Sequence, residues 1–207
     1  MSFSDANGTI MLDLISNVIR SRRSVKPADM DEARAVPEEL VWRLLENGTW
    51  APTHGLTEPW RFHVFTGAAR ARLAEALPQI YKEVTPPAEV REDKLVKLGQ
   101  NPLLAPVVVA CVVEKRGGEK IPFLEEVEAV ACALQNVMLS ATAAGLGSFW
   151  SSPPVLGSAV VALWLGQGEE DLCVGLLYLG WPKAGRTTAM VPRKPVTEKV
   201  VWHTEPS

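Results

Sequence analysis

A single apolar run, APVVVACVVE at residues 105–114, constrains the fold of this chain more than any other segment. Valine dominates the run, and β-branched residues favour an extended strand. Polar and apolar residues do not alternate along it, so neither face of such a strand is suited to water. We therefore predict a central strand in a sheet that is covered by helices on both faces.

Helical and extended segments alternate on either side of this run. Apolar residues recur at helical spacing in several segments, and alternation of residue type marks the strand WRFHVFTG. The predicted helices cover 10–22, a segment from Pro37 through Leu45, 68–77, 124–145 and 154–166. The predicted strands cover 60–67, 105–114, 172–182 and, as a short strand or turn, 147–152, with EKVVWH at 198–203 as a last strand. This order predicts one α+β or α/β layer domain over residues 1–207.

Three further segments are polar or bounded by prolines, and we expect them to be loops: 25–37, 51–59 and 78–101. The last of these is strongly charged and is expected to form a mobile excursion from the fold. The stretch 129–147 is long and nearly uncharged, but its amide and hydroxyl side chains argue against a membrane span. The glutamates at its start suit a helix N-terminus, so we predict a buried helix.

Net charge and cysteine use limit the classes of function that fit this chain. The 207 residues include 21 Lys and Arg against 24 Asp and Glu, a formal net charge of -3, which argues against a general nucleic-acid binder. Cys111, Cys132 and Cys173 lie far apart in apolar runs, which predicts buried thiols in a reducing cytoplasm. The N-terminal residues lack the basic start and apolar block of a signal peptide. We therefore expect a cytoplasmic protein with neither nucleic-acid nor membrane partners.

A small basic cluster, VIRSRRSVK at residues 18–26, ends the first predicted helix. Arg20, Arg22 and Arg23 would complement the helix dipole at its C-terminus, which is one interpretation. The other is an anion site, because arginine binds phosphate in bidentate fashion and Ser24 and Lys26 add two donors. GLGSFW at 145–150 lacks the third glycine of a dinucleotide-binding loop and follows a helix instead of a strand. A phosphorylated ligand would therefore be held by the arginines.

Five motifs occur in an order that resembles a known family. They are RSRRSVK (20–26), WAPTHGLTEPWRFHVF (50–65), GLGSFW (145–150), GLLYLGWP (175–182) and PRKPVTEKVV (192–201). Over about residues 11–202 the chain resembles the FMN-dependent nitroreductase family, most closely its small, compact NAD(P)H-nitroreductase branch. The resemblance implies an α+β fold, an α/β/α sandwich with a mainly antiparallel sheet, formed by one FMN-binding domain over residues 1–207.

The resemblance also implies roles for the basic residues. Arg22, Arg23 and Ser24 match the positions that hold the FMN phosphate and ribityl chain, and Arg193 matches a late arginine that binds the phosphate. Lys26 matches a lysine that approaches the pyrimidine end of the flavin ring, where it would stabilise the negative charge that builds on reduction. Arg193 could equally be a solvated residue of the tail.

The motifs at 50–65 and 145–150, with Ser151 directly after the second, contain the remaining positions that the resemblance assigns to the flavin. Pro52, Thr53 and His54 match a loop that reaches the flavin of the partner subunit. His54 could also be a loop histidine without a ligand, and Trp150 could be plain core. The residues expected along the isoalloxazine ring are Phe149, Trp150 and Ser151.

Three positions depart from the family pattern. Trp50 and Ser151 stand where relatives in the compact branch often carry arginine, which removes positive charge near the ligand. Pro153 stands where the family usually has glycine, near the flavin N5 atom. Because proline has no N–H, this position cannot donate a hydrogen bond to N5.

By resemblance, the function is that of an oxidoreductase. NADH or NADPH would reduce the bound FMN, and a nitroaromatic or quinone acceptor would reoxidise it in a ping-pong cycle. The flavin carries the chemistry, so no catalytic side chain is assigned, and the histidines at 54, 63 and 203 have no metal-ligand spacing. The resemblance further implies an intertwined homodimer with FMN at its interface and EKVVWH added to the partner's sheet. The alternatives are a non-catalytic flavin carrier or sensor and a flavin-consuming or dehalogenating enzyme.

Overall fold

The valine run forms strand β2 (Val107–Val113), and every residue of this strand is buried. The fold was analysed in a computed structural model that describes residues 5–118, 120–185 and 192–204. The sheet has four strands in the order β1-β2-β4-β3, and each neighbouring pair is antiparallel. The other strands are β1 (Trp60–Thr66), β3 (Gly147–Ser151) and β4 (Leu172–Gly180). The predicted antiparallel α+β architecture is confirmed.

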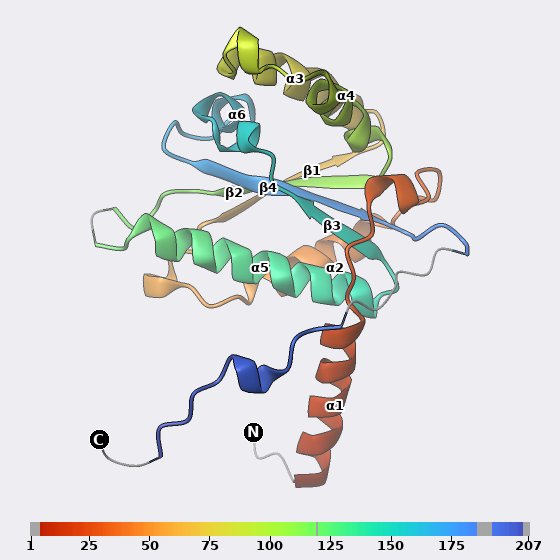
Figure 1. Ribbon diagram of the computed structural model, residues 1–207, viewed down its shortest axis with the longest axis vertical. Coiled ribbons are helices and arrows are strands. Elements are labelled where there is room, and N and C mark those ends of the chain that lie inside the picture. The colour runs from red at the N-terminus through yellow and green to blue at the C-terminus, as the bar shows by residue number, and fades with distance from the viewer. Residues whose placement is uncertain (1–4, 119, 186–191, 205–207) are drawn as a thin grey trace.

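Alternate residues of β2 point into two separate cores, because successive side chains of a strand face opposite sides of the sheet. Val109 and Cys111 pack on one side with α2 and α5, and Val108 and Ala110 pack on the other side with α3, α4 and α6. Figure 1 shows these two helical layers above and below the sheet. The helix bounds are α2 (Glu38–Thr49), α3 (Ala69–Val84), α4 (Glu92–Gln100), α5 (Phe123–Ala143) and α6 (Ala159–Trp164).

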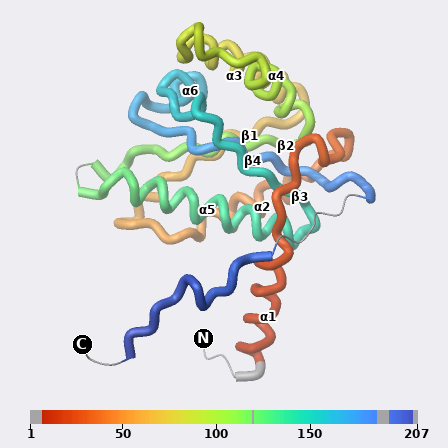
Figure 2. The backbone as a smooth tube through the Cα atoms, viewed as in Figure 1, coloured from red at the N-terminus to blue at the C-terminus, as the bar shows by residue number. Residues whose placement is uncertain are grey.

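Helix α1 (Asp5–Ser21) projects away from this sandwich, as Figures 1 and 2 show. The predicted helix over 10–22 is confirmed and begins five residues earlier. Its apolar stripe does not enter either core, since the side chains are 48% to 63% exposed. The exposed apolar residues of α1 are Ile10, Met11, Leu12, Leu14, Ile15 and Ile19. An exposed apolar surface of this size on one helix is uncommon in a soluble monomeric protein.

The segment 78–101 is helical, and the predicted irregular excursion is wrong. Helix α3 continues through Pro78 to Val84, and α4 follows after a short turn. The charges of this segment lie on exposed faces, whereas Ile80 and Leu98 are buried in the core beneath them. The two apolar residues anchor both helices to the sandwich.

Three smaller expectations are also wrong. The predicted helix over 154–166 is interrupted, because only α6 within it is an α-helix and a 3-10 turn precedes it. EKVVWH forms no strand; its residues are exposed and, after a 3-10 turn, lack regular structure. Cys132 is exposed on α5, although Cys111 and Cys173 are buried as expected. Burial raises the pKa of the Cys173 thiol to about 11, which makes it a poor nucleophile.

Short 3-10 turns connect several of the main elements. They are η1 (Pro27–Asp29), η2 (His54–Leu56), η3 (Pro87–Glu89), η4 (Asn101–Leu103), η5 (Pro154–Gly157) and η6 (Val196–Glu198). Over the described part of the chain, no helix is both long enough and apolar enough to cross a membrane. In the same ranges no cluster of His, Cys, Asp and Glu could hold a metal ion.

We predict that Gly175→Ala destabilises the fold. A Cβ at this position would lie 2.1 Å from Nε1 of Trp150, so the packed indole ring would have to move. The expected loss is about 1–3 kcal/mol in the free energy of unfolding, measured by urea denaturation. Gly99→Ala in α4 is the matched control, because its new Cβ would make only ordinary contacts at 3.5 Å or more. Equal stabilities of the two variants would contradict the role assigned to Gly175.

Candidate functional site

The basic segment that follows α1 is attached to the first residues of β3. Ser24 forms a parallel bridge with Ser148, and the backbone N–H of Val25 donates to the Ser148 carbonyl at 2.9 Å. Gly147 permits this approach, since a Cβ there would lie 2.7 Å from Cβ of Val25. The segment is therefore held in a fixed position at the open edge of the sheet.

The arginines of this segment divide between the two interpretations of the basic cluster. Nη1 of Arg23 donates to the carbonyls of Arg20 at 2.5 Å and Arg22 at 2.8 Å. This contact satisfies a carbonyl at the end of α1, as the helix-dipole interpretation predicts. Arg22, Ser24 and Lys26 differ, because their side-chain donors have no hydrogen bond or ion pair to any residue that the structure describes.

These three donors fit a phosphorylated ligand by their chemistry. A guanidinium, a hydroxyl and an ammonium group follow one another within five residues, on backbone that is fixed against β3. Each is a hydrogen-bond donor, and two carry positive charge, which is the donor set that phosphate oxygens require. The residues present therefore fit the phosphate end of FMN.

Strand β3 carries the residues expected along the flavin ring, and it points them to opposite faces. Trp150 packs into the core beneath α5 and donates from Nε1 to the Val174 carbonyl at 3.2 Å. Phe149 lies on the other face, with its ring centre 6.1 Å from that of Tyr178. Ser151 shares the face of Phe149 by the alternation of the strand. The structure thus gives Trp150 a packing role, and a flavin contact for it stays a prediction.

His54 lies in a strained loop and is oriented by a carboxylate. Its Nδ1 atom lies 2.6 Å from Oε2 of Glu125, in the first turn of α5. Leu56 and Glu58 adopt positive φ values of 54° and 46°, a region that non-glycine residues seldom occupy. Such strain gathers at functional sites, and no sequence pattern could have identified Glu125 as the partner of His54.

The loop and the basic segment lie at opposite ends of α5. His54 pairs with Glu125 in its first turn, whereas Ser24 is bridged to β3, which begins just after α5 ends at Ala143. The 18 residues from Glu125 to Ala143 span about 27 Å at about 1.5 Å each. Figure 1 shows the same separation along the helix. Within one chain, Pro52, Thr53 and His54 are therefore not brought together with the arginines.

The remaining predicted positions lie elsewhere on the surface. Arg193 is exposed in the C-terminal segment, and its contact with a phosphate stays a prediction. Ser151 and Pro153 line a cavity of about 230 Å³ together with Lys94 and Lys97 of α4. The sequence interpretation missed both lysines, because it treated their segment as an excursion from the fold.

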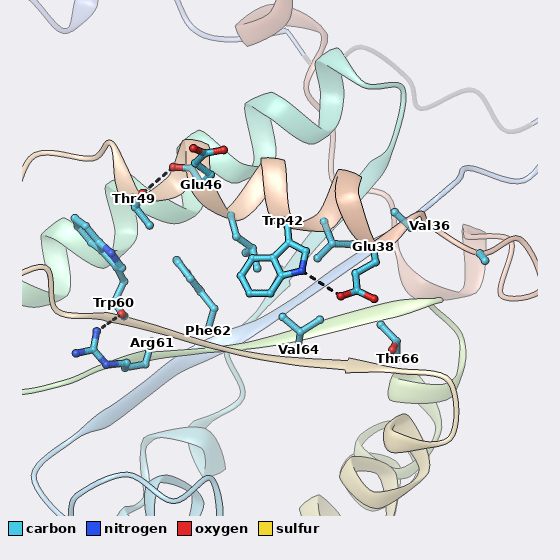
Figure 3. Close-up of a pocket in the computed structure, with 13 residues that line it drawn as sticks. Val36, Glu38, Trp42, Glu46, Thr49, Trp60, Arg61, Phe62, Val64 and Thr66 are labelled. Carbon is cyan, nitrogen blue, oxygen red and sulfur yellow. Dashed lines mark hydrogen bonds between the residues drawn. The ribbon is translucent and has the colours of Figure 1, made fainter.

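A second, larger cavity of about 890 Å³ lies between α2 and the outer strand β1 (Figure 3). Trp42, Trp60, Phe62 and Val64 are among the apolar residues that line it, and the Trp42 indole donates to Glu38 at 3.2 Å. It contains none of the residues predicted to bind the flavin. Strand β1 pairs with β2 on one side only in the described sheet, so this cavity borders an unpaired strand edge.

The structure is an α+β sandwich with a set of hydrogen-bond donors at a sheet edge whose chemistry suits an anion. The chain belongs to the nitroreductase family, whose model matches residues 19–181. It is 30% identical over 180 residues to YdjA of Escherichia coli K12, provisionally named an NAD(P)H nitroreductase, covering 86% of this chain and 92% of YdjA.

Solved structures show the same fold. A nitroreductase-like family protein from Bacillus cereus superimposes with a TM-score of 0.76 at 25% identity, covering 98% of each chain. The FMN-dependent nitroreductase NfnB from Mycobacterium smegmatis, solved in complex with NADPH, superimposes with a TM-score of 0.69 at 21% identity. That match covers 93% of this chain and 100% of NfnB. The resemblance stated from the five sequence motifs is thereby confirmed at the level of the family.

Proposed function

We propose that this protein is an FMN-dependent oxidoreductase that uses NADH or NADPH to reduce a nitroaromatic or quinone acceptor by a ping-pong mechanism. The observation that carries the proposal is the set of donors on Arg22, Ser24 and Lys26, fixed against β3 in a chain of the nitroreductase family. The FMN dependence and bound NADPH of the M. smegmatis structure support the choice of cofactor and reductant.

The proposed roles of the residues follow from their chemistry. Arg22 and Ser24 would bind the phosphate, and Lys26 would place a positive charge beside the ring. When bound, FMN supplies the redox chemistry, because it accepts hydride from a nicotinamide and reduces a second substrate. Pro153 has no N–H to donate near N5, so a neighbouring amide has to serve there or the flavin potential differs from that of glycine-containing relatives.

Anaerobic titration of the purified protein with NADH and with NADPH tests this function. We expect a visible flavin spectrum that bleaches with at least one nicotinamide and recovers when a nitroaromatic or a quinone is added. A bound flavin that resists both nicotinamides would contradict the enzyme and support a carrier or sensor, which the Pro153 departure favours. Analysis of the products separates simple reduction from dehalogenation or consumption of the flavin.

Substitution of the two arginines separates cofactor binding from helix capping. Arg22→Ala should weaken FMN binding about tenfold or more, since a hydrogen bond to a charged group contributes about 1.5–3 kcal/mol. Arg23→Ala should lower the thermal stability, which Arg22→Ala should not, because only Arg23→Ala removes the hydrogen bonds to the Arg20 and Arg22 carbonyls. Arg43→Ala on the exposed face of α2 is the control. Unchanged flavin content in Arg22→Ala would overturn the assignment of the phosphate site.

We further propose that the active form is a homodimer in which each flavin site is completed by the partner. The separation of about 27 Å along α5 supports this, because one chain cannot bring His54 to its own arginines. Apolar surface for such contacts is present on α1 and on the C-terminal segment, where Val201 and Trp202 are 78% and 84% exposed. The unpaired edge of β1 offers a place for the partner's segment.

The C-terminal segment should therefore matter for assembly. We expect Trp202→Asp to shift the protein toward monomer and to lower its flavin content, because a charge would enter an apolar contact. Sedimentation equilibrium over a range of concentrations measures the shift. Leu163→Asp, at a half-exposed position on α6, is the control and should leave the assembly unchanged. A dimer constant unaffected by Trp202→Asp would show that the segment does not contact the partner.

A further inference from the structure

The cavity of about 230 Å³ beside Ser151 and Pro153 is lined by positively charged side chains and by no negatively charged ones among the described residues. Lys94 and Lys97 line it from α4, and none of the described residues that line it is acidic. Its other residues give a mostly apolar floor that suits a flat hydrophobic body. Those residues are Tyr81, Leu98, Asn101, Pro154, Val155, Leu176 and Tyr178.

The carboxylate of Asp93 is shared between Arg91 and the two lysines. Asp93 accepts two hydrogen bonds from Arg91, at 2.9 and 3.0 Å, and the Arg91 guanidinium holds the pKa of Asp93 below its ordinary value. Nζ of Lys97 lies 3.7 Å from the same carboxylate, which is a distant contact. Lys94 is half-buried and makes no ion pair within the described ranges.

A hydroxyl on the cavity wall is also available to a ligand. Tyr178 is only 3% exposed as a residue, but its hydroxyl oxygen is not fully buried and makes no hydrogen bond to any described residue. The hydroxyl is therefore open to the cavity that Tyr178 lines. Burial raises the pKa of the Tyr178 hydroxyl well above its ordinary value. The group is therefore a neutral O–H donor at physiological pH and can donate to an anion.

From these features we infer that the cavity binds a small aromatic carboxylate, whose ring lies on the apolar floor and whose carboxylate meets Lys94, Lys97 and the Tyr178 hydroxyl. The inference rests on the proposed function in one respect: the ligand would be an electron acceptor, because Ser151 and Pro153 border both the cavity and the expected flavin ring. The volume favours a single ring, since pockets for larger ligands measure about 300–1,000 Å³. The alternative anion for the same two lysines is the 2′-phosphate of NADPH.

Calorimetric titration of the full-length protein, with its flavin as purified, tests the inference without turnover. The probes are benzoate and its neutral isostere benzamide. We expect benzoate to bind about fivefold more tightly than benzamide, as a partly exposed pair of charges allows. The double variant Lys94→Met with Lys97→Met should lose this preference. The Lys94→Arg with Lys97→Arg variant should keep it, and so should Lys82→Met, which removes an exposed charge outside the cavity.

Three outcomes would overturn the inference. The first is equal binding of benzoate and benzamide by the unmodified protein. The second is a preference for benzoate that survives in the double methionine variant. The third is a double variant that loses affinity for NADPH, but not for NADH, while the ratio of benzoate to benzamide is unchanged, which would assign the lysines to the 2′-phosphate.

Kinetics then separate this inference from the proposed function. If the protein reduces nitroaromatics, the preference in kcat/KM for 4-nitrobenzoate over 4-nitrobenzamide should also fall about fivefold in the double methionine variant. Flavin bleaching by NADH should be unaffected. A protein that fails to turn over but still selects benzoate would retain the inferred cavity and lose the proposed activity. Tyr178→Phe should weaken benzoate more than benzamide, because it removes one donor to the carboxylate.

Discussion

Because both faces of β2 are closed to water, the sheet requires a helical layer on each side, and the positions of the other elements follow from that need. Val109 and Cys111 are covered by α2 and α5, and Val108 and Ala110 by α3, α4 and α6. The neighbouring strand β4 is almost as deeply buried. This arrangement leaves β3 at one edge of the sheet, where the basic segment attaches, and β1 at the other.

Much of this architecture could be predicted from local patterns. The alternating strand at Trp60 and the long helix after Phe123 have the periodicities of a strand and a helix, and the β-branched composition of the valine run indicates a buried strand. Local patterns failed where a few buried residues decided the outcome. In 78–101 the charged residues are as numerous as the apolar ones, yet the burial of Ile80 and Leu98 holds this segment in helices on the sandwich. Abundant surface charge therefore gave the wrong expectation of an excursion.

The candidate site shows the same limit. The order of the motifs could identify Arg22, Ser24 and Lys26, because their residue types carry the chemistry. Contacts between distant segments could not be read in this way. The contact of His54 with Glu125 and the place of Lys94 beside Pro153 arise only when the chain folds. The basic cluster likewise has two uses that depend on the geometry of the helix end, because Arg23 donates to the carbonyls of Arg20 and Arg22 whereas Arg22 and Ser24 make no such contact.

The length of helix α5 sets the distance between the His54 loop and the basic segment of the same chain. In the proposed dimer it fixes how far the strained loop of one subunit stands from its own anion site, and hence where the partner's site has to lie. One additional turn would lengthen α5 by about 5.4 Å and shift Glu125 away from His54, whose loop is held between α2 and β1. The length of α5 is thus matched both to the core that it covers and to the position of the loop that meets its first turn.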